Sequence, residues 1–436
     1  MYRLETDKEL NEDILADFIS KHNQEVSNRL EPLMKEYISD FPVYHQPKKP
    51  DYKPDNRIGV NFPKYIVDTF NGFFIGNPIK ITCDDEGVSE YVEFIDQYND
   101  QDDNNAELAK LCDIFGRGYE MYYVDENSQL CITYCSPIEA FMIYDDSVLE
   151  RERFFVRMYK DENDVVHGSV SDDAKVRYFT IKGTLKWGED EEHHFGGVPA
   201  TEYRENEERQ GLFEPVLSMV HAYNKAISEK ANDVDYFADA YMKILGAKLT
   251  EDELKFLREN RIINFEGEDS GKLVVEFLQK PDADATQENL INRLERLIFQ
   301  ISMVANISDE NFGTSSGIAL KYKLLSMSNL EKTKERKFTS GMNRRYKILF
   351  SHPLARTRVG QDDWTKLKFT FTPNFPANIL EEAQIASQLS GITSRETQLK
   401  VLSIVDNVQE EIQRIEKNTD PLTYNTDYPT NRISEE

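Results

Sequence analysis

The sequence is poor in cysteine, and it contains no long apolar run. Its four cysteines, Cys83, Cys112, Cys131 and Cys135, are too few and too unevenly spaced for a disulfide framework in 436 residues. No stretch approaches the roughly 20 apolar residues that span a bilayer, and the first ten residues lack the basic and apolar segments of an export signal. We therefore expect a soluble, unexported protein with reduced thiols and no membrane partner.

Basic charge is also scarce. The chain has 52 Lys and Arg against 79 Asp and Glu, which gives a net charge of −27. Tight duplex binding normally depends on cationic side chains that release counterions from phosphates, so a generally basic DNA-gripping protein is excluded. The 25 Phe and 22 Tyr still supply large packing area. A chain of this length predicts about two to four folded units.

Short catalytic motifs are absent as well. The sequence has no G-x-x-x-x-G-K-[ST], no H-E-x-x-H and no G-x-S-x-G. Cys131 and Cys135, together with His193 and His194, offer a zinc ligand set, but the C-x3-C spacing within CITYC favours a strand with buried thiols. We therefore predict no metal, no cofactor and no catalytic residue.

The first half of the chain mixes helical and strand patterns. Residues from about 2 to 40 carry apolar positions at helical spacing, apart from a gap at His22, and another helix stops near Gly76. Strand patterns then follow from about 79 to 205, namely IKIT, YEMYYV, QLCITYC, AFMIYD, RFFVRMY, KVRYFTI and TLKW. Residues 1–212 therefore predict one α/β unit with an antiparallel sheet.

Long helical patterns dominate the second half. Residues 213–245 carry an apolar stripe that ends before Gly246, which predicts a helix of roughly 50 Å. A small insert with the strand patterns RIINFEG and KLVVEFL occupies 246–285. Residues 286–307 carry apolar side chains at alternating spacings of four and three, which is typical of a helix that packs on another helix. Those side chains are Leu290, Leu294, Leu297, Ile301 and Val304.

Residues 308–316 interrupt the helical pattern, because Gly and short polar residues remove both helix propensity and core anchors. The interruption predicts a mobile loop, with Asp309, Glu310, Asn311, Phe312, Gly313, Thr314 and Ser315. Residues 317–375 then predict a third long helix and the strand KLKFTFTP.

The third helix is basic in an acidic chain. From 321 to 358 there are eleven Lys or Arg and two Glu, a net charge of +9. A solvated helix face is the ordinary explanation, but the contrast favours contact with the acidic surface of a neighbouring copy or with DNA phosphates. The residues predicted for this contact are Lys321, Lys323, Lys332, Lys334, Arg336, Lys337, Arg344 and Arg345.

The C-terminal part predicts three short helices within 376–419. Gly391 closes the first of them, and the pair Thr393 and Glu396 forms a capping box that opens the second. Residues 420–436 have no periodic apolar face and are predicted to be disordered.

The sequence also carries a resemblance to a known family. It is carried by GVPATEYREN at 197–206, NDVDYFADAYMKILG at 232–246, SGIALKYKLLSM at 316–327 and NFPANILEEAQIASQLSGITSRETQLKVLSIVDNVQEEIQRI at 374–415. With the order of the parts, these stretches resemble the portal, or head-to-tail connector, proteins of tailed bacteriophages, in the branch typical of long-tailed phages of Gram-positive hosts. The resemblance covers residues from about 10 to about 418.

The resemblance implies an α+β portal fold with a wing, a helical stem, a clip and a crown. The parts it assigns are the wing at 1–212, stem helices at 213–245 and 286–307, the clip at 246–285, the tunnel loop at 308–316, the long basic helix with the return strand of the wing at 317–375, the crown at 376–419 and a tail without assigned role at 420–436. Leu290, Leu294, Leu297 and Ile301 would pack against neighbouring subunits.

It also implies a structural virion protein rather than an enzyme. About twelve copies would form a ring at one capsid vertex, as the channel for double-stranded DNA packaging and ejection. The implied partners are the terminase large subunit as packaging motor, a head-tail adaptor protein, and the major capsid and scaffolding proteins. The implied location is the portal vertex of the virion, reached from the host cytoplasm during assembly.

Two interpretations of other classes stay open. One is a Mg²⁺-dependent nucleic-acid enzyme or accessory subunit that uses Asp233, Asp235 and Asp239, which recur on one predicted helix. The other is an acidic cytosolic scaffold that is monomeric or dimeric. Binding of Mg²⁺ distinguishes the first from the portal interpretation, and the absence of a ring distinguishes the second.

Overall fold

The protein folds into two compact units. One contains Met1–Ile307 and Leu324–Asn374, and the other contains Ser308–Lys323 and Phe375–Glu436. The computed structural model describes residues 1–50, 53–238, 242–245, 250, 274–277, 284–307, 322–374, 379–402, 404–405 and 408–418.

The chain begins with a strand rather than a helix. Strand β1 (Tyr2–Arg3) pairs in parallel with β5 (Ala140–Tyr144), so the predicted first helix is wrong at its start. Helix α1 (Glu12–Glu25) begins at the N-cap Asn11, whose side chain accepts a hydrogen bond from the Ile14 amide. A π-helical segment η1 (Val26–Leu30) connects it to α2 (Glu31–Tyr37).

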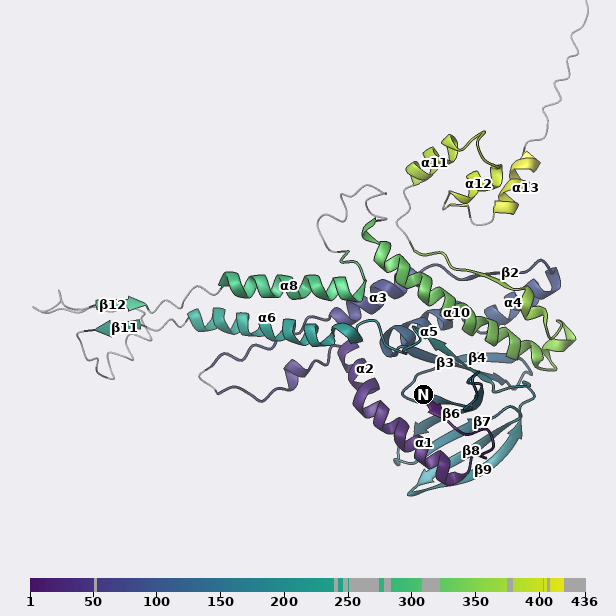
Figure 1. Ribbon diagram of the computed structural model, residues 1–436, viewed down its shortest axis with the longest axis horizontal. Coiled ribbons are helices and arrows are strands. Elements are labelled where there is room, and N and C mark those ends of the chain that lie inside the picture. Colours follow the sequence, from purple (N-terminus) through teal and green to yellow (C-terminus); the bar gives the residue numbers. More distant parts are fainter. Residues whose placement is uncertain are drawn as a thin grey trace, which may run out of the picture. The chain divides into compact units, whose positions relative to one another are not determined.

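A six-stranded sheet forms one side of the first unit, with β9 at its outer edge (Figure 1). The order is β1-β5-β6-β7-β8-β9, with β6 (Glu152–Lys160), β7 (Val166–Ser171), β8 (Lys175–Lys182) and β9 (Thr184–Glu192). All its pairs are antiparallel except β1 with β5, which largely confirms the predicted antiparallel sheet. Strand β7 was not predicted, because most side chains of its sequence VHGSVS are small or polar and give no clear apolar pattern. Helix α1 packs on this sheet through a core that includes Leu15, Phe18 and Phe141.

A second sheet and several helices complete the unit. The sheet order is β10-β3-β4, with β3 (Arg117–Val124), β4 (Leu130–Cys135) and β10 (Ala200–Arg204). The helices are η2 (Pro42–His45), α3 (Phe62–Ile75), α4 (Glu86–Tyr98) and α5 (Gln101–Phe115). Helix α3 ends at Gly76 as predicted. Helix α5 ends at Gly116, where φ is +81° and an added Cβ would lie 2.1 Å from the Arg209 backbone.

The cysteines lie where the strand pattern puts them. Cys131 and Cys135 are buried on β4, Cys112 is buried on α5, and Cys83 is partly exposed. All four are free thiols. The prediction of buried thiols on β4 is therefore confirmed.

The segment after residue 324 returns to the first half of the chain. Helix α10 (Leu325–Ser351) packs against strand β10, which also contacts α5. After two short 3₁₀ turns, η5 (Ala355–Thr357) and η6 (Asp363–Lys366), strand β13 (Lys368–Thr370) pairs antiparallel with β2 (Lys80–Thr82). The predicted strand KLKFTFTP thus pairs with a strand that lies almost 300 residues earlier in the sequence.

Two long helices lie side by side (Figure 1). They are α6 (Leu217–Ala238), which follows the 3₁₀ turn η3 (Glu214–Val216), and α8 (Asp284–Ser302). The prediction of helix up to 245 is wrong at its end, because β11 (Met242–Leu245) pairs antiparallel with β12 (Val274–Phe277). Ile244 faces Val275 in this ladder, a pairing that suits β-branched side chains. Helix α6 is therefore about 33 Å long rather than about 50 Å.

The predicted strand KLVVEFL is confirmed as β12, whereas RIINFEG lies outside the described residues. The second unit contains α11 (Ile379–Gln388), α12 (Arg395–Lys400) and α13 (Val408–Asn418), as the three-helix prediction required. Its N-cap prediction is corrected: Ser394, not Thr393, caps α12 by accepting from the Thr397 amide. The tail at 420–436 lies outside the described residues. In the described part of the chain, no helix combines the length and the apolar character needed to cross a membrane.

The gap at His22 proves to be part of the buried face of α1. Its ring stacks on Phe141 with centroids 4.6 Å apart, and its Nε2 lies 3.2 Å from the Ile138 carbonyl oxygen. Because a carbonyl only accepts, Nε2 carries the proton. Burial lowers the pKa of His22 to about 4, against the effect of the Ile138 hydrogen bond.

This burial predicts a pH-dependent contribution to stability. Between pH 6.5 and about 4 the unfolded chain binds a proton at His22 that the folded chain does not, so the His22 contribution is lost as the pH falls through this window. The stability difference between wild type and His22→Gln should therefore shrink by about 3 kcal/mol from pH 7 to pH 4. Urea unfolding at several pH values measures it. His45→Gln, at an exposed histidine, is the control, and an equal pH trend for both variants would refute the assignment.

Candidate functional site

Helix α8 carries two apolar stripes with different surroundings. Ile291 and Ile298 are 6% and 0% exposed and face the interior of their own unit. Leu290 and Ile301 are 51% and 47% exposed. Leu294 and Leu297 are half-buried, and Val304, the last apolar position predicted for this seam, is buried. We call Leu290, Leu294, Leu297 and Ile301 the α8 outer face.

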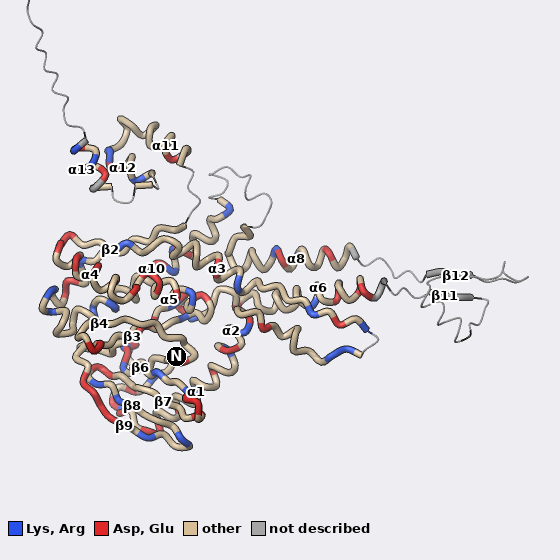
Figure 2. The backbone as a smooth tube through the Cα atoms, turned by 180° about the vertical axis from the view of Figure 1, so that it is seen from behind, with Lys and Arg blue, Asp and Glu red and all other residues tan. Residues whose placement is uncertain are grey.

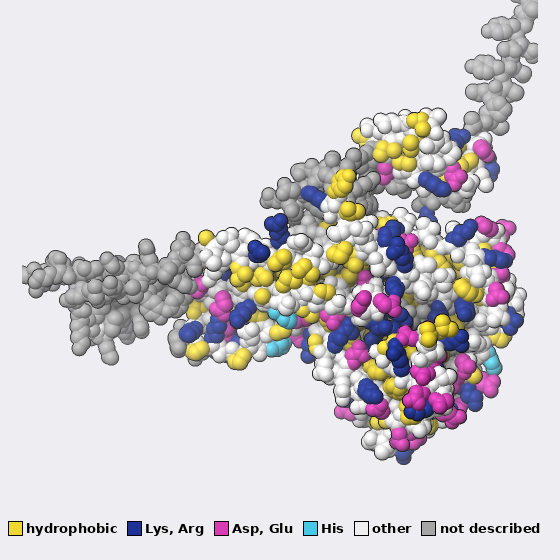
Figure 3. Space-filling model, in the orientation of Figure 1, with side chains coloured by type: hydrophobic (Ala, Val, Ile, Leu, Met, Phe, Trp, Pro, Cys, Tyr) yellow, Lys and Arg dark blue, Asp and Glu magenta, His cyan; other side chains and the backbone are white. Residues whose placement is uncertain are grey.

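Hydrophobic side chains gather over α8 in the space-filling view (Figure 3). The predicted seam is therefore only partly covered by its own unit. Sequence spacing missed the inward stripe, although Ile291 and Ile298 are also one heptad apart. The two apolar stripes are offset by one residue and have the same periodicity. Spacing alone therefore cannot show which stripe is buried within the subunit and which is exposed.

The basic helix α10 places Arg345 inside the protein. Its side chain is 0% exposed, with Nε 2.8 Å and Nη2 2.7 Å from the two carboxylate oxygens of Glu120 on β3. Nη2 also donates to Asn105 Oδ1 at 2.6 Å, and the hydroxyls of Tyr122 and Tyr203 donate to Glu120 at 2.9 and 3.1 Å. A bidentate, fully buried ion pair whose carboxylate also accepts hydrogen bonds from two hydroxyls is stronger than an exposed one.

Lys334 is the second buried cation of α10. It is 0% exposed, pairs with Asp113 on α5, donates to the Ala109 carbonyl at 3.1 Å and lies 3.1 Å from Glu205 after β10. Burial alone would lower the pKa of Lys334, but the charges of Asp113 and Glu205 outweigh it and raise that pKa. Burial raises the pKa of Asp113 well above its ordinary value despite Lys334. Two carboxyls thus share one ammonium group.

The prediction for the basic helix therefore needs correction at these two residues. Lys334 and Arg345 cannot meet DNA or a neighbouring copy, because carboxylates of their own chain already surround them. Three other cations also have intrachain partners: Lys332 with Glu335, Lys337 with Glu207, and Arg344 with Glu152. Lys323 and Arg336 are exposed. Lys321 and the predicted loop residues Asp309, Glu310, Asn311, Phe312, Gly313, Thr314 and Ser315 lie outside the described residues.

The three aspartates of the magnesium interpretation do not form a described site. Asp233 accepts a hydrogen bond from Gln287 of α8 at 3.0 Å, and Asp235 accepts one from Asn56. Asp239 lies outside the described residues. Where the structure describes the chain, no three His, Cys, Asp or Glu side chains are grouped so as to hold a metal ion. The two aspartates instead link α6 to its neighbours.

The family model for phage portal proteins of the SPP1 Gp6-like type matches residues 16–421. The chain belongs to this family. Its predicted identity as a portal protein is thereby confirmed, and neither these relatives nor the described residues favour the magnesium-dependent alternative.

Individual relatives agree with the family. The portal protein of Clostridium phage phiCD119 is 24% identical over 399 residues, which cover 84% of this chain and 86% of that protein. The portal protein of Bacillus phage SPP1 is 25% identical over 398 residues, covering 84% and 77%. The neck of an empty GTA particle matches the fold with a TM-score of 0.51 at 11% identity, covering 87% of this chain and 94% of that one. The mixed helix and sheet fold of the portal type is thus confirmed.

Removal of the Arg345 guanidinium should destabilise the first unit strongly. In Arg345→Met the carboxylate of Glu120 stays buried without its cation, which costs about 3–5 kcal/mol of unfolding free energy. In Lys337→Met the lost partner is Glu207, whose side chain is 63% exposed, and the cost should stay below about 1 kcal/mol. Denaturant unfolding compares the two variants. Similar losses in both would show that burial of Arg345 does not control its contribution.

Proposed function

We propose that this portal protein assembles into a closed ring at one capsid vertex and forms the channel for double-stranded DNA during packaging and ejection. The observation that carries the proposal is the α8 outer face. Leu290 and Ile301 are about half exposed on a long helix, and removal of such apolar surface from water favours association. A row at heptad spacing suits a helix of a second copy.

The ring is the simplest assembly for this surface. A contact between two unlike surfaces of identical subunits, repeated around an axis, closes into a ring of about twelve copies in this proposal. Membership of the portal family supports it. Leu290, Leu294, Leu297 and Ile301 would then be subunit-packing residues.

The charge distribution suits a channel through which DNA slides. The net charge is −27, and the buried cations of α10 are neutralised within the chain. Acidic residues follow one another along the end of β9 (Figure 2), in the run Glu189, Asp190, Glu191 and Glu192. Since phosphate clamps would hold the duplex, a channel with few of them keeps the barrier to translocation low. Exposed cations such as Lys323 and Arg336 stay candidates for contact with DNA or a neighbour.

The remaining assignments follow the portal plan. Residues 246–285 would form the clip that docks the terminase large subunit and later the head-tail adaptor, 308–316 the tunnel loop, and 376–419 the crown. The wing would meet the major capsid and scaffolding proteins. In this proposal the protein is a structural component of the virion portal vertex that assembles in the host cytoplasm, and it carries no catalytic residue and needs no cofactor.

Charges on the α8 outer face should abolish the ring without unfolding the subunit. In Leu290→Asp and Ile301→Asp the carboxylate stays in water in the single subunit, but it would be buried in the ring. Leu294→Asp and Leu297→Asp should act in the same direction. Sedimentation velocity measures the loss, and circular dichroism confirms the fold. Gln300→Asp, exposed on the same helix but outside the seam, is the matched control. Full-size rings from Leu290→Asp and Ile301→Asp would contradict the proposal.

Shortening the predicted tunnel loop should separate assembly from transport. Deletion of residues 309–315 removes Gly and polar residues that are proposed to yield to the passing duplex, so rings should form normally while packaging falls. Protection of DNA from nuclease in a packaging assay measures the effect. Packaging at the wild-type rate would exclude the loop from the mechanism.

A further inference from the structure

Three ionisable side chains meet beneath α10 without access to water. The side chains of Lys334 on α10 and Asp113 on α5 are 0% exposed, and that of Glu205, directly after β10, is 1% exposed. We call these three residues the buried triad. If both carboxyl groups were ionised, the buried triad would carry a net charge of −1, and an uncompensated charge inside a protein is very costly.

Other charged groups close to the buried triad have partners of their own. They are Glu202 and Glu207 with Arg204 and Arg209, at distances of 2.7 to 3.4 Å, and Glu331 with Lys332, at 3.4 Å. On the side of α3, the rings of Phe70 and Phe74 have their centroids 5.3 and 5.0 Å from Lys334 Nζ and carry no charge. The buried triad must therefore balance its charge by itself.

The hydrogen bonds of the buried triad show where the imbalance lies. Lys334 Nζ donates to Asp113 Oδ1 and to the Ala109 carbonyl oxygen. Among the described residues, Asp113 Oδ2 and both carboxyl oxygens of Glu205 have no hydrogen-bond donor, although Glu205 Oε2 lies 3.1 Å from Lys334 Nζ. Ionised carboxylates only accept hydrogen bonds, so neither carboxylate can satisfy the other. One proton between them turns one carboxyl into a donor and satisfies an oxygen on each.

The main chain keeps the two carboxyl groups together. The Leu212 amide donates to the Asp113 carbonyl oxygen at 2.8 Å, and the Glu205 amide donates to the Gly116 carbonyl oxygen at 2.9 Å. Burial raises the pKa of Asp113, and the charge of Glu205 and a hydrogen bond with it act in the same direction, against Lys334. Both carboxyl groups are thus held where ionisation of one opposes ionisation of the other.

We propose that Asp113 and Glu205 hold one proton between them at neutral pH, and that this proton closes a clamp that fastens α10 to α5 and β10. The buried triad is then neutral, with one ammonium group, one carboxylate and one carboxylic acid. The proton is taken from solvent during folding, because both carboxyl groups are ionised in the unfolded chain, where their pKa values are about 3.9 and 4.3. Loss of the proton at alkaline pH leaves a buried negative charge and weakens the clamp. The clamp belongs to the single subunit and does not depend on the proposed ring.

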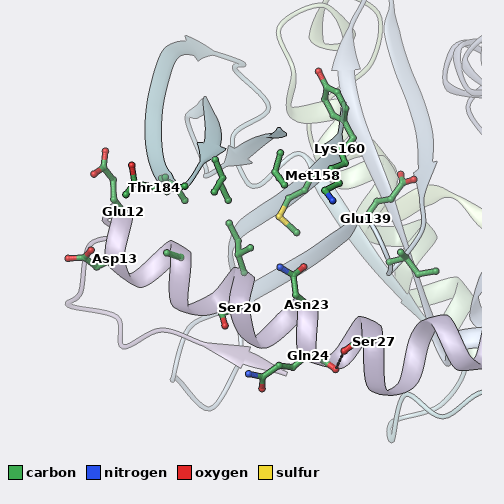
Figure 4. A pocket seen from close by; sticks show the side chains of 18 of the residues that line it. Glu12, Asp13, Ser20, Asn23, Gln24, Ser27, Glu139, Met158, Lys160 and Thr184 are labelled. Atoms are coloured by element: carbon green, nitrogen blue, oxygen red, sulfur yellow. Dashed lines mark hydrogen bonds between the residues drawn. The ribbon is translucent and has the colours of Figure 1, made fainter. Parts of the chain in front are cut away.

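Acidic side chains elsewhere in the first unit need no such proton. Glu12, Asp13 and Glu139 line a groove of about 1300 Å³ beside α1, and all three are exposed (Figure 4). Water and salt screen the repulsion among exposed carboxylates. The buried carboxylate of Glu120 has Arg345 as a cation of its own. The buried triad differs from both, because it combines full burial with two carboxyl groups for one cation.

Infrared spectroscopy of the full chain at pH 8 detects the proton directly, because the C=O stretch of a carboxylic acid is separate from the bands of ionised carboxylates. The wild type should show an acid band at this pH. Asp113→Asn and Glu205→Gln should each lack it, because the remaining carboxylate alone neutralises Lys334. Asp103→Asn, at an exposed carboxylate of the same helix, is the matched control and should keep the band. A wild type without an acid band, or a band that both triad variants keep, would overturn the proposal.

The pH dependence of unfolding gives an independent readout. Above about pH 5 the folded wild type holds one proton that the unfolded chain has released, so its stability falls as the pH rises. The unfolding equilibrium constant of the wild type, relative to that of Asp113→Asn, should therefore rise about tenfold per pH unit, or about a hundredfold from pH 6 to pH 8. Urea unfolding measures the ratio, and Asp103→Asn should follow the wild type. A ratio that does not change with pH would contradict the shared proton.

A double variant separates a shared proton from two ordinary ion pairs. Asp113→Asn combined with Glu205→Gln leaves the ammonium of Lys334 buried without a carboxylate, so it should unfold at a far lower urea concentration than either single variant. Each single variant should be at least as stable as the wild type at pH 8. Single variants that are destabilised as strongly as the double variant would show that Lys334 requires both carboxylates in the ionised form, and would overturn the proposal.

Discussion

The burial of two cations beneath α10 is the constraint on which the rest of the first unit depends. Arg345 and Lys334 have no access to water, so the carboxylates of Glu120 and Asp113 must lie against them. Those carboxylates belong to β3 and α5, more than 200 residues earlier in the chain. The ion pairs therefore tie α10 to the first half, and β13 completes the same connection by pairing with β2. The long helices α6 and α8 extend from a body that is fixed in this way.

The same pairs explain how an acidic chain uses a basic helix. Two of the eleven cations in this segment are buried against Glu120 and Asp113, and others pair with surface carboxylates of the same chain such as Glu207. The surface left for solvent is then acidic on balance, which favours passage of DNA over its retention. Association must rest on apolar surface instead. The α8 outer face is a described surface that offers it.

Much of this was predictable from the sequence, and the failures have physical causes. Gly76 and Gly391 marked helix ends correctly. At Gly391 the reason is the positive φ of +79°, which few other residues tolerate. Apolar runs as short as the one at Ile244 fit helix and strand equally well, so only pairing with Val275 decided for a strand. The charge of Arg345 predicted a position on the surface. A sequence does not reveal which carboxylate will pair with such a side chain inside the protein.

The central claim is that this chain closes into a ring, and the native mass of the unmodified protein tests it most directly. Light scattering on the full chain, with negative-stain images of the same fraction, gives both the copy number and the shape. The account predicts a particle of about twelve chains with a central hole. A monomer or an open dimer at every protein concentration and in the presence of scaffolding protein would contradict it.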